Sequence, residues 1–293
     1  MRYLGRFAPS PTGSLHLGSV ATALFAVARA RQQGGVVLLR VEDLDRPRVV
    51  AGSEAEQRSD LAWLGLDLVE PASLGLGPTR QSERIDRYEA AIAMLDAAGH
   101  TYLCDCSRAE IARAASAPHE GEEGPAYPGT CRPLGMAPRA FKRPPALRLA
   151  APSADVDDFV LRRGDGVFAY QLAVVVDDLA MGVSEIVRGI DLRPSVPRQT
   201  ALARLLGGEL PPVVHVPLLV GPSGARLAKR DGGSTVRELA ARGVTPSRIL
   251  QSVARAYGFD GPGHDVVAEL AACFDPQNFS VSAVPLGAVE AAA

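Results

Sequence analysis

The alternation of strand-like and helix-like segments at the start of the chain limits the possible folds more than any other feature. Residues 2–8, "RYLGRFA", are typical of a short strand, and residues 36–43, "VVLLRVED", have the near-continuous Val and Leu content of a strand buried on both faces of a parallel sheet. Between them, residues 15–35 have helical apolar spacing and end on two glycines. This order predicts a right-handed βαβ unit, and hence an α/β fold.

A second helix is predicted after this unit, over residues 52–66, with Ser53 as its N-cap and Glu56 at its third position. Another follows over residues 81–100. From about residue 101 to residue 163 glycines, prolines and charges become frequent, which indicates an insertion into the α/β fold. Short antiparallel strands are expected in and just after it, at residues 146–150, 158–164 and 166–170.

The α/β pattern returns at residue 171, where residues 171–189 predict a helix and then a strand. The chain from residue 235 is expected to be mainly helical. Four regions are therefore expected: residues 1–100 and 171–225 as the two halves of a catalytic domain, 101–170 as the insertion, and 226–293 as a loop followed by a small helical region.

The overall charge of the protein limits the classes of function it can have. The 293 residues are 47% hydrophobic and carry a formal charge of −2 with a pI near 6.2, so a general nucleic-acid-coating protein is excluded and any RNA contact must use a local basic patch. No apolar run is long enough to span a membrane, and "MRYLGRF" lacks the apolar stretch of a signal peptide. We expect a cytoplasmic protein with no membrane partner.

The turn after the first strand, within residues 5–19, "GRFAPSPTGSLHLGS", is the strongest candidate ligand site. Ligands of open parallel sheets bind at the carboxyl ends of the strands, and the following helix N-terminus offers free N–H groups to a phosphate. His16 can add a hydrogen bond there. A tight loop with His16 as a surface residue fits the same letters taken alone.

Two further groups of residues carry chemistry. Glu42, Asp43 and Asp45 follow the second strand, where carboxylates can hold a substrate ammonium or pair with nearby arginines. Three of the four cysteines, Cys104, Cys106 and Cys131, fall in one short window, which favours zinc over disulfides, although free buried thiols would also fit. From chemistry alone His119 is the fourth zinc ligand, and Cys273 is expected to be a core thiol.

The complete string "RFAPSPTGSLHLGS" closely resembles the first signature of the glutamyl-type class I aminoacyl-tRNA synthetases. "HLGS" takes the place of their HIGH motif, with His16 and Gly18 matching and Ser19 replacing the last histidine. "RLAKR", residues 226–230, takes the place of the KMSKS motif, so that Lys229 matches its lysine. Taken alone, "RLAKR" is typical of a solvated loop. Because it follows the His16 motif in the order found in the family, the resemblance implies an ATP site formed by His16, Gly18 and Lys229. His16 and Lys229 are the implied catalytic residues.

This resemblance also implies the residues of a glutamate pocket. They are Arg6, Phe7, Ala8, Pro9, Ser10, Glu42, Tyr170 and Arg188. In the family, Glu42 faces the α-amino group. Arg6 and Arg188 can each bind the side-chain carboxylate in a bidentate fork, and the sequence leaves open which of them does.

The cysteine window is similar to the zinc insertion of the glutamyl-queuosine tRNA(Asp) synthetases, short paralogues of glutamyl-tRNA synthetase. Their pattern C-x-C…Y-x3-C falls on Cys104, Cys106, Tyr127 and Cys131, which favours Tyr127 over His119. The resemblance implies one structural Zn²⁺ per chain, ATP as substrate with Mg²⁺, and a Rossmann-type class I catalytic domain without an anticodon-binding domain.

The implied reaction has two steps. Glutamate and ATP form glutamyl adenylate, and the glutamyl group passes to queuosine at the wobble position of tRNA(Asp). A monomer is expected, with an RNA-binding patch drawn from Arg139, Lys142, Arg143, Arg148, Arg162 and Arg163. The alternatives are a truncated glutamyl-tRNA synthetase that charges the tRNA 3′ end and a non-catalytic tRNA-binding paralogue.

Overall fold

The structure is a computed structural model. It describes residues 3–114, 127–137, 139–153, 155–221, 235–259, 263, 265–279, 281, 283–286 and 289. The chain divides into two compact units: residues 1–83, 182–193 and 211–293 form the first, and residues 84–181 and 194–210 form the second. The four regions expected from the sequence stay a prediction.

Among the residues that the structure describes, the first unit contains three pairs of parallel strands. Its strands are β1 (Leu4–Phe7), β2 (Val36–Leu39), β6 (Ile186–Gly189), β7 (Val213–Val216), β8 (Leu218–Val220) and β9 (Ala283–Pro285). β1 pairs with β2, β6 with β7 and β8 with β9. The main chain of Leu4 also exchanges hydrogen bonds with Ser184, just before β6. The predicted strand–helix–strand unit and its parallel pairing are confirmed.

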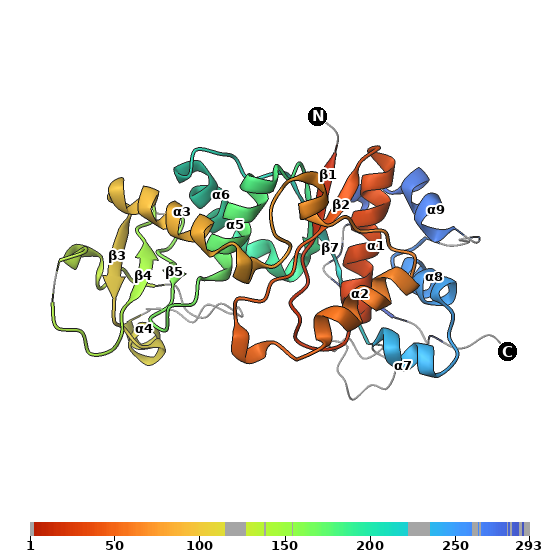
Figure 1. The fold of residues 1–293 in the computed structure, drawn as a ribbon, viewed down its shortest axis with the longest axis horizontal. Coiled ribbons are helices and arrows are strands. Elements are labelled where there is room, and N and C mark those ends of the chain that lie inside the picture. The colour runs from red at the N-terminus through yellow and green to blue at the C-terminus, as the bar shows by residue number, and fades with distance from the viewer. Residues whose placement is uncertain are drawn as a thin grey trace. The chain divides into compact units, whose positions relative to one another are not determined.

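The described part of the first unit also contains five α-helices. They are α1 (Leu17–Gln32), α2 (Ser53–Trp63), α7 (Val236–Ala241), α8 (Pro246–Ala256) and α9 (Val266–Cys273). α1 contacts β1 and β2, and α8 and α9 also pack against it (Figure 1). Because α1 is enclosed in this way, small and apolar residues fill it: Ala21, Ala23, Leu24 and Phe25 are all fully buried.

Glycine at position 35 lets α1 turn back into β2. A Cβ added to Gly35 would lie 2.1 Å from the main-chain oxygen of Tyr3, so no larger residue fits there without moving β1. Gly34, the residue before Gly35, has a φ of +64°, a backbone conformation that favours glycine. The pair of glycines therefore fixes where the helix ends and how closely β2 approaches β1.

Two local predictions in the first unit are wrong. Ser53 is not the N-cap of α2: Gly52 precedes the helix, and the buried Ser53 hydroxyl bonds instead to the main chain of Gly13. Cys273 is not a core thiol. It is exposed at the end of α9, because Phe274, the next residue, takes the buried position in the core of the first unit.

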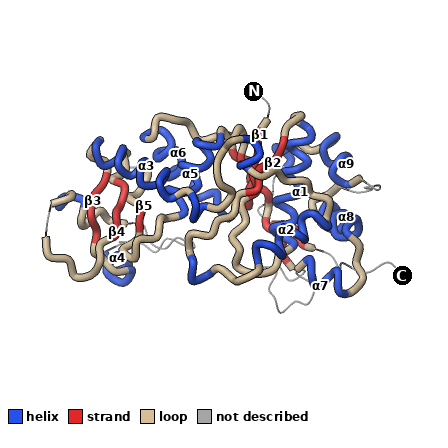
Figure 2. The backbone as a smooth tube through the Cα atoms, in the orientation of Figure 1, coloured by secondary structure: helices blue, strands red, loops and turns tan. Residues whose placement is uncertain are grey.

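In its described residues the second unit contains an antiparallel sheet and four α-helices. Its elements are α3 (Ile85–Ala97), β3 (Thr101–Cys104), α4 (Arg108–Ala114), β4 (Ala146–Leu149), β5 (Val160–Arg162), α5 (Tyr170–Met181) and α6 (Val196–Leu205). The strand order is β3-β4-β5 (Figure 2). Two of the three expected strands are confirmed. The third, at 166–170, makes a single bridge from Phe168 to Arg162, and β3 takes the third place in the sheet instead.

A buried ion pair links α5 to the start of α3. Arg84 Nε donates to Asp177 at 2.6 Å, and both side chains are inaccessible to solvent. The Tyr88 hydroxyl donates to the other carboxylate oxygen at 2.8 Å. The charge of Asp177 is therefore fully hydrogen-bonded where it is buried, as a stable interior requires. Within the described residues no helix is both long enough and apolar enough to cross a membrane.

Candidate active site and metal centre

The loop from Ala8 to His16 is held in place by its main-chain carbonyls. Pro9 accepts a hydrogen bond from the main-chain N–H of Glu42, and Pro11 accepts one from Val50. Gln57 donates to the carbonyls of both Ser10 and Gly13, at 3.2 and 2.8 Å. Prolines have no N–H of their own, so these donors from the chain after β2 and from α2 set the loop's shape.

Ser53 and Gln57 are contributors to this site that sequence reasoning missed. They are four residues apart on α2, so they lie on one face of the helix, and Ser53 both donates to and accepts from Gly13. Gly13 itself has a φ of +139°, a conformation that favours glycine. The sequence signal for this role was the helical spacing of two uncharged polar residues, Ser53 and Gln57, on a helix rich in charged residues.

His16 lies at the N-terminal boundary of α1, as predicted, and is paired with a distant segment. It forms an antiparallel bridge with Thr235, and the N–H of Val236 donates to Leu15 at 3.1 Å. Thr235 is buried and caps α7 through reciprocal hydrogen bonds with Glu238. Thr235 and Val236 are thus fixed beside the start of α1. Lys229 itself lies outside the described residues.

The carboxylates after β2 have different surroundings. Asp43 accepts hydrogen bonds from the N–H and the hydroxyl of Ser82, at 2.8 and 2.6 Å. Both of its carboxylate oxygens are therefore used to hold the chain at Ser82. Glu42 is partly exposed and accepts from the fully buried Arg40 at 3.2 Å. Of the two, Glu42 is therefore the carboxylate better placed to meet a ligand.

Arg6 and Arg188, the two candidate carboxylate forks, lie on β1 and β6 and are both buried, with 4% and 3% of their surface exposed. Arg6 donates to the main-chain oxygen of Val187, the residue before Arg188, at 3.2 Å. The structure thus brings the two guanidinium-bearing residues to neighbouring positions in the first unit. Phe7 is buried beside Arg6, Ala8 and Pro9 are partly exposed, and Ser10 is exposed.

His215 on β7 is a further residue of this region that the sequence did not single out. It stands opposite Arg188 in the β6–β7 register. Burial, followed by the positive charges of Arg188 and Arg193, lowers the pKa of His215 to about 4. Among the described residues its buried Nε2 has no hydrogen-bond partner. We conclude that the imidazole is neutral at pH 7.

Because His215 is buried and neutral, we expect the protein to lose stability in mild acid. The unfolded chain, whose histidine has a pKa near 6.5, binds more protons than the folded protein as the pH falls from about 6.5 to about 4, so the free energy of unfolding decreases over that range. His215→Gln is expected to reduce this decrease, measured by urea unfolding at pH 7 and pH 5 through the fluorescence of the single tryptophan, Trp63. His100→Gln, in the second unit, is the control, and an equal decrease in wild type and His215→Gln would contradict the prediction.

Three cysteines of the second unit converge on one point. The Sγ atoms of Cys104, Cys106 and Cys131 all lie within 4.8 Å of one another, and the Cys106 and Cys131 sulfurs are 3.5 Å apart. The Tyr127 Oη lies 3.3 Å from the Cys104 sulfur and 3.6 Å from that of Cys106. Four donor atoms thus meet in a mostly buried cluster. His119 lies outside the described residues.

These spacings fit a tetrahedral zinc ion. Zn–S and Zn–O bonds of about 2.3 and 2.0 Å imply S···S edges near 3.8 Å and S···O edges near 3.5 Å. Tyr127 also accepts the N–H of Cys131 at 2.8 Å, which aims its oxygen at the cluster. Burial raises the pKa of the Tyr127 hydroxyl and that of Cys106, the latter to about 11, so these two donors become anionic more readily when a cation is bound beside them.

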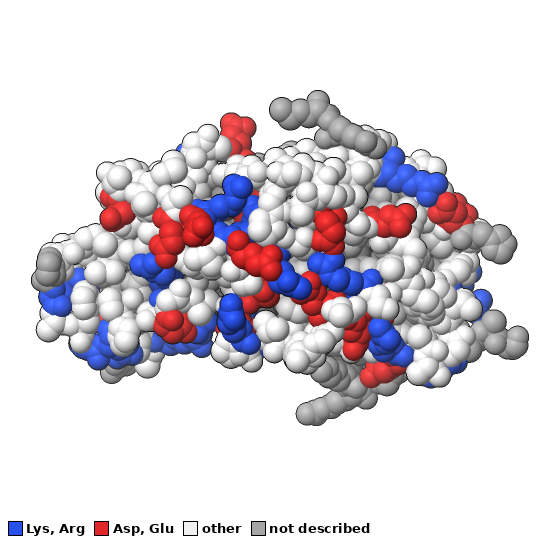
Figure 3. Space-filling model, in the orientation of Figure 1, with Lys and Arg blue, Asp and Glu red and all other residues white. Residues whose placement is uncertain are grey.

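The basic residues expected to bind RNA are mostly paired with acids. Arg139 pairs with Asp105, Lys142 and Arg143 with Glu110, Arg162 with Glu89, and Arg163 with Asp165. On the face drawn in Figure 3, acidic and basic side chains are interspersed. The inclusion of Arg148 in a surface patch is wrong, because this residue is buried on β4. Tyr170, expected in the glutamate pocket, begins α5 in the second unit, and its role stays a prediction.

Comparisons with known proteins agree with this geometry. Residues 4–154 and 136–270 match the family model of the catalytic domain of class I tRNA synthetases (E and Q). Among curated relatives, a glutamyl-Q tRNA(Asp) synthetase of Nocardia farcinica is 48% identical over 93% of this chain and 89% of its own length. One of Geobacter sulfurreducens is 46% identical over 97% and 94%.

Solved structures give the same fold. A glutamate-tRNA synthetase of Elizabethkingia anophelis superposes with a TM-score of 0.78 and 27% identity, over 100% of this chain and 68% of the other. A glutamate tRNA ligase of Elizabethkingia meningosepticum, solved in complex with its amino acid, also gives 0.78 and 27%. The expected class I synthetase catalytic fold is confirmed, and the chain belongs to the glutamyl-Q tRNA(Asp) synthetase family.

Proposed function

We propose that this protein activates glutamate with ATP and transfers the glutamyl group to queuosine at the wobble position of tRNA(Asp). The glutamate carboxylate attacks the α-phosphate of ATP, pyrophosphate leaves, and a nucleophile of the queuosine base then displaces AMP from the glutamyl adenylate. No protein nucleophile is required. Orientation of the reactants and stabilisation of charge on the phosphates supply the rate.

One contact supports the nucleotide half of the proposal most strongly, the bridge between His16 and Thr235. Lys229 precedes Thr235 by six residues, and a chain of that length spans at most about 22 Å. The two halves of the ATP site, separated by some two hundred residues of sequence, are therefore tethered to each other within the first unit. The free N–H groups at the start of α1, with His16 and Gly18, are the proposed phosphate contacts, and ATP carries Mg²⁺.

Glutamate is the proposed amino acid because two buried arginines, Arg6 on β1 and Arg188 on β6, lie on strands that contact each other. In this proposal one of them holds the side-chain carboxylate, and Glu42 holds the α-ammonium group. Arg40, which donates to Glu42 at 3.2 Å, orients that carboxylate.

Zinc is the proposed occupant of the Cys104, Cys106, Tyr127 and Cys131 cluster. Three thiols with one phenol form a soft, mostly buried donor set, and four ligands close the coordination sphere. Such an ion has no open position for water, so its proposed role is to hold the β3 end of the second unit together. A monomer is sufficient for every site described.

Transfer of labelled glutamate to tRNA(Asp) with and without queuosine tests the proposed function. The match to glutamate-tRNA synthetases favours one rival, charging of the tRNA 3′ end, and the same experiment separates the two.

A further inference from the structure

Arg148 is an unusual residue of the second unit. It lies on β4 opposite Tyr102 of β3, and only 8% of its surface is exposed. Arginine is seldom buried unless its charge is balanced. Within the described residues Arg148 makes no ion pair; its NH1 group donates to the main-chain oxygen of Asp158 at 3.2 Å, and its Nε is buried without a hydrogen-bond partner.

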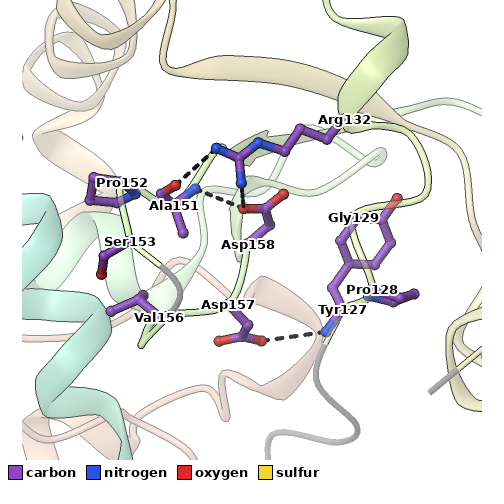
Figure 4. Close-up of a pocket in the computed structure, with 10 residues that line it drawn as sticks. All are labelled: Tyr127, Pro128, Gly129, Arg132, Ala151, Pro152, Ser153, Val156, Asp157 and Asp158. Atoms are coloured by element: carbon purple, nitrogen blue, oxygen red, sulfur yellow. Dashed lines mark hydrogen bonds and ion pairs between the residues drawn. The ribbon is translucent and has the colours of Figure 1, made fainter. Parts of the chain in front are cut away.

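The carboxylates near Arg148 are occupied by other groups. Asp157 is held by Arg198 at 2.7 and 2.9 Å and accepts the N–H of Tyr127. Asp158 accepts from Tyr102, Arg132 and the N–H of Ala151, at 2.7, 3.2 and 2.7 Å. Figure 4 shows these contacts of Arg132 and of the Tyr127 N–H around a cavity of about 450 Å³. The charge of Arg148 is thus directed to a different partner.

The guanidinium interacts with the Cys104 side chain and stacks on the ring of Tyr127. The guanidinium carbon of Arg148 lies 3.8 Å from the ring centroid, which is close stacking of a cation on an aromatic face. The oxygen of the same ring is the one that meets the cysteine sulfurs. With three thiolates and a phenolate around a divalent cation, the centre carries a net charge of about −2, and burying such a charge is costly unless a cation is near. Arginine remains protonated at any working pH.

We propose that Arg148 is a positioning residue of the metal centre. Its fixed charge offsets the anionic donor set, and its planar guanidinium holds the Tyr127 ring so that the oxygen stays at the cluster. Both effects favour tyrosine as the fourth ligand. This inference rests on the proposed zinc site.

Zinc affinity in four proteins tests it. Wild type, Arg148→Met, Tyr127→Phe and the double variant are stripped of metal and titrated with Zn²⁺ against a chromophoric chelator. Arg148→Met is expected to weaken zinc binding by about tenfold or more, as loss of an outer partner of a ligand does. In the Tyr127→Phe background the same change is expected to cost less than about threefold, because the ring then has no oxygen to hold at the metal and the donor set has lost one negative charge.

Two further variants serve as controls for the zinc titrations. Arg148→Lys retains the charge but not the planar stack, so its zinc affinity is expected between those of wild type and Arg148→Met, and it serves if the methionine variant does not fold. Arg162→Met, on the neighbouring strand β5, removes an arginine that pairs with Glu89 and is expected to leave zinc affinity unchanged.

The outcomes separate the two proposals. If wild type binds no zinc, the metal centre is refuted and the role of Arg148 with it. If wild type binds about one zinc but Arg148→Met binds it as tightly, the role of Arg148 is refuted while the metal centre stands. The same conclusion follows if Arg148→Met costs as much zinc affinity in the Tyr127→Phe background as it does in the wild-type background.

Discussion

Replacing Lys229 by alanine is expected to slow glutamate-dependent ATP–pyrophosphate exchange, measured without RNA, by about a hundredfold. A flexible ammonium group that follows the triphosphate neutralises charge as pyrophosphate leaves, and removal of one such stabilising group typically costs a factor of about 10² to 10³. Lys229 precedes Thr235 by six residues, so the bridge of Thr235 to His16 limits how far this lysine can lie from the start of α1.

The chain offers a matched control, because it contains only two lysines, Lys142 and Lys229. Lys142 is 69% exposed and pairs with Glu110 at 3.0 Å in the second unit. Lys142→Ala is expected to leave the exchange rate unchanged. Near-normal exchange by Lys229→Ala would remove that lysine from the ATP site, and absence of exchange in the wild type without RNA, with recovery on adding tRNA, would favour the charging enzyme.

The second large effect concerns the choice of amino acid. The wild-type protein is expected to activate glutamate at least about a thousandfold better than glutamine in kcat/KM, because the amide of glutamine places donors against the donors of a buried guanidinium. Lysine keeps the positive charge but loses the bidentate fork. Either Arg6→Lys or Arg188→Lys is therefore expected to reduce the preference to about tenfold, and the variant that does so identifies the arginine that binds the side chain.

The control is Arg29→Lys, which alters a partly buried arginine of the same unit that pairs with Glu185 at 2.8 Å. Its preference for glutamate is expected to match that of the wild type. If both Arg6→Lys and Arg188→Lys keep the full preference, neither arginine reads the side-chain carboxylate, and the proposed glutamate pocket is wrong.

The part of the fold that the sequence predicts best is the part with strong local patterns. β2 is almost entirely Val and Leu, and α1 ends at glycines that its turn into β2 requires, so both were foreseeable. β3 was missed because "TYLC" is four residues long and becomes a strand only by pairing with β4. The role of Ser53 was misread because its hydroxyl is used across the loop of Gly13 rather than within its own helix.

The candidate sites follow the same division. Motif residues such as His16 and the three cysteines were found because their identity and spacing alone indicate chemistry. His215 was missed and Arg148 was assigned to an RNA-binding patch, because their surroundings come from residues remote in sequence. Tyr127 lies 21 positions from Arg148, and Arg188 stands opposite His215 only through strand register. Burial of a charged residue cannot be read from a strand four residues long.

The most direct test of the account is to ask where labelled glutamate is attached. The protein is incubated with ATP, labelled glutamate and three RNAs: tRNA(Asp) with queuosine, the same tRNA without queuosine, and queuosine-containing tRNA(Asp) that lacks its 3′-terminal adenosine. Transfer to queuosine predicts label on the first and third RNAs and none on the second. Label on the second RNA and none on the third would place the glutamyl group at the 3′ end and contradict the proposed function.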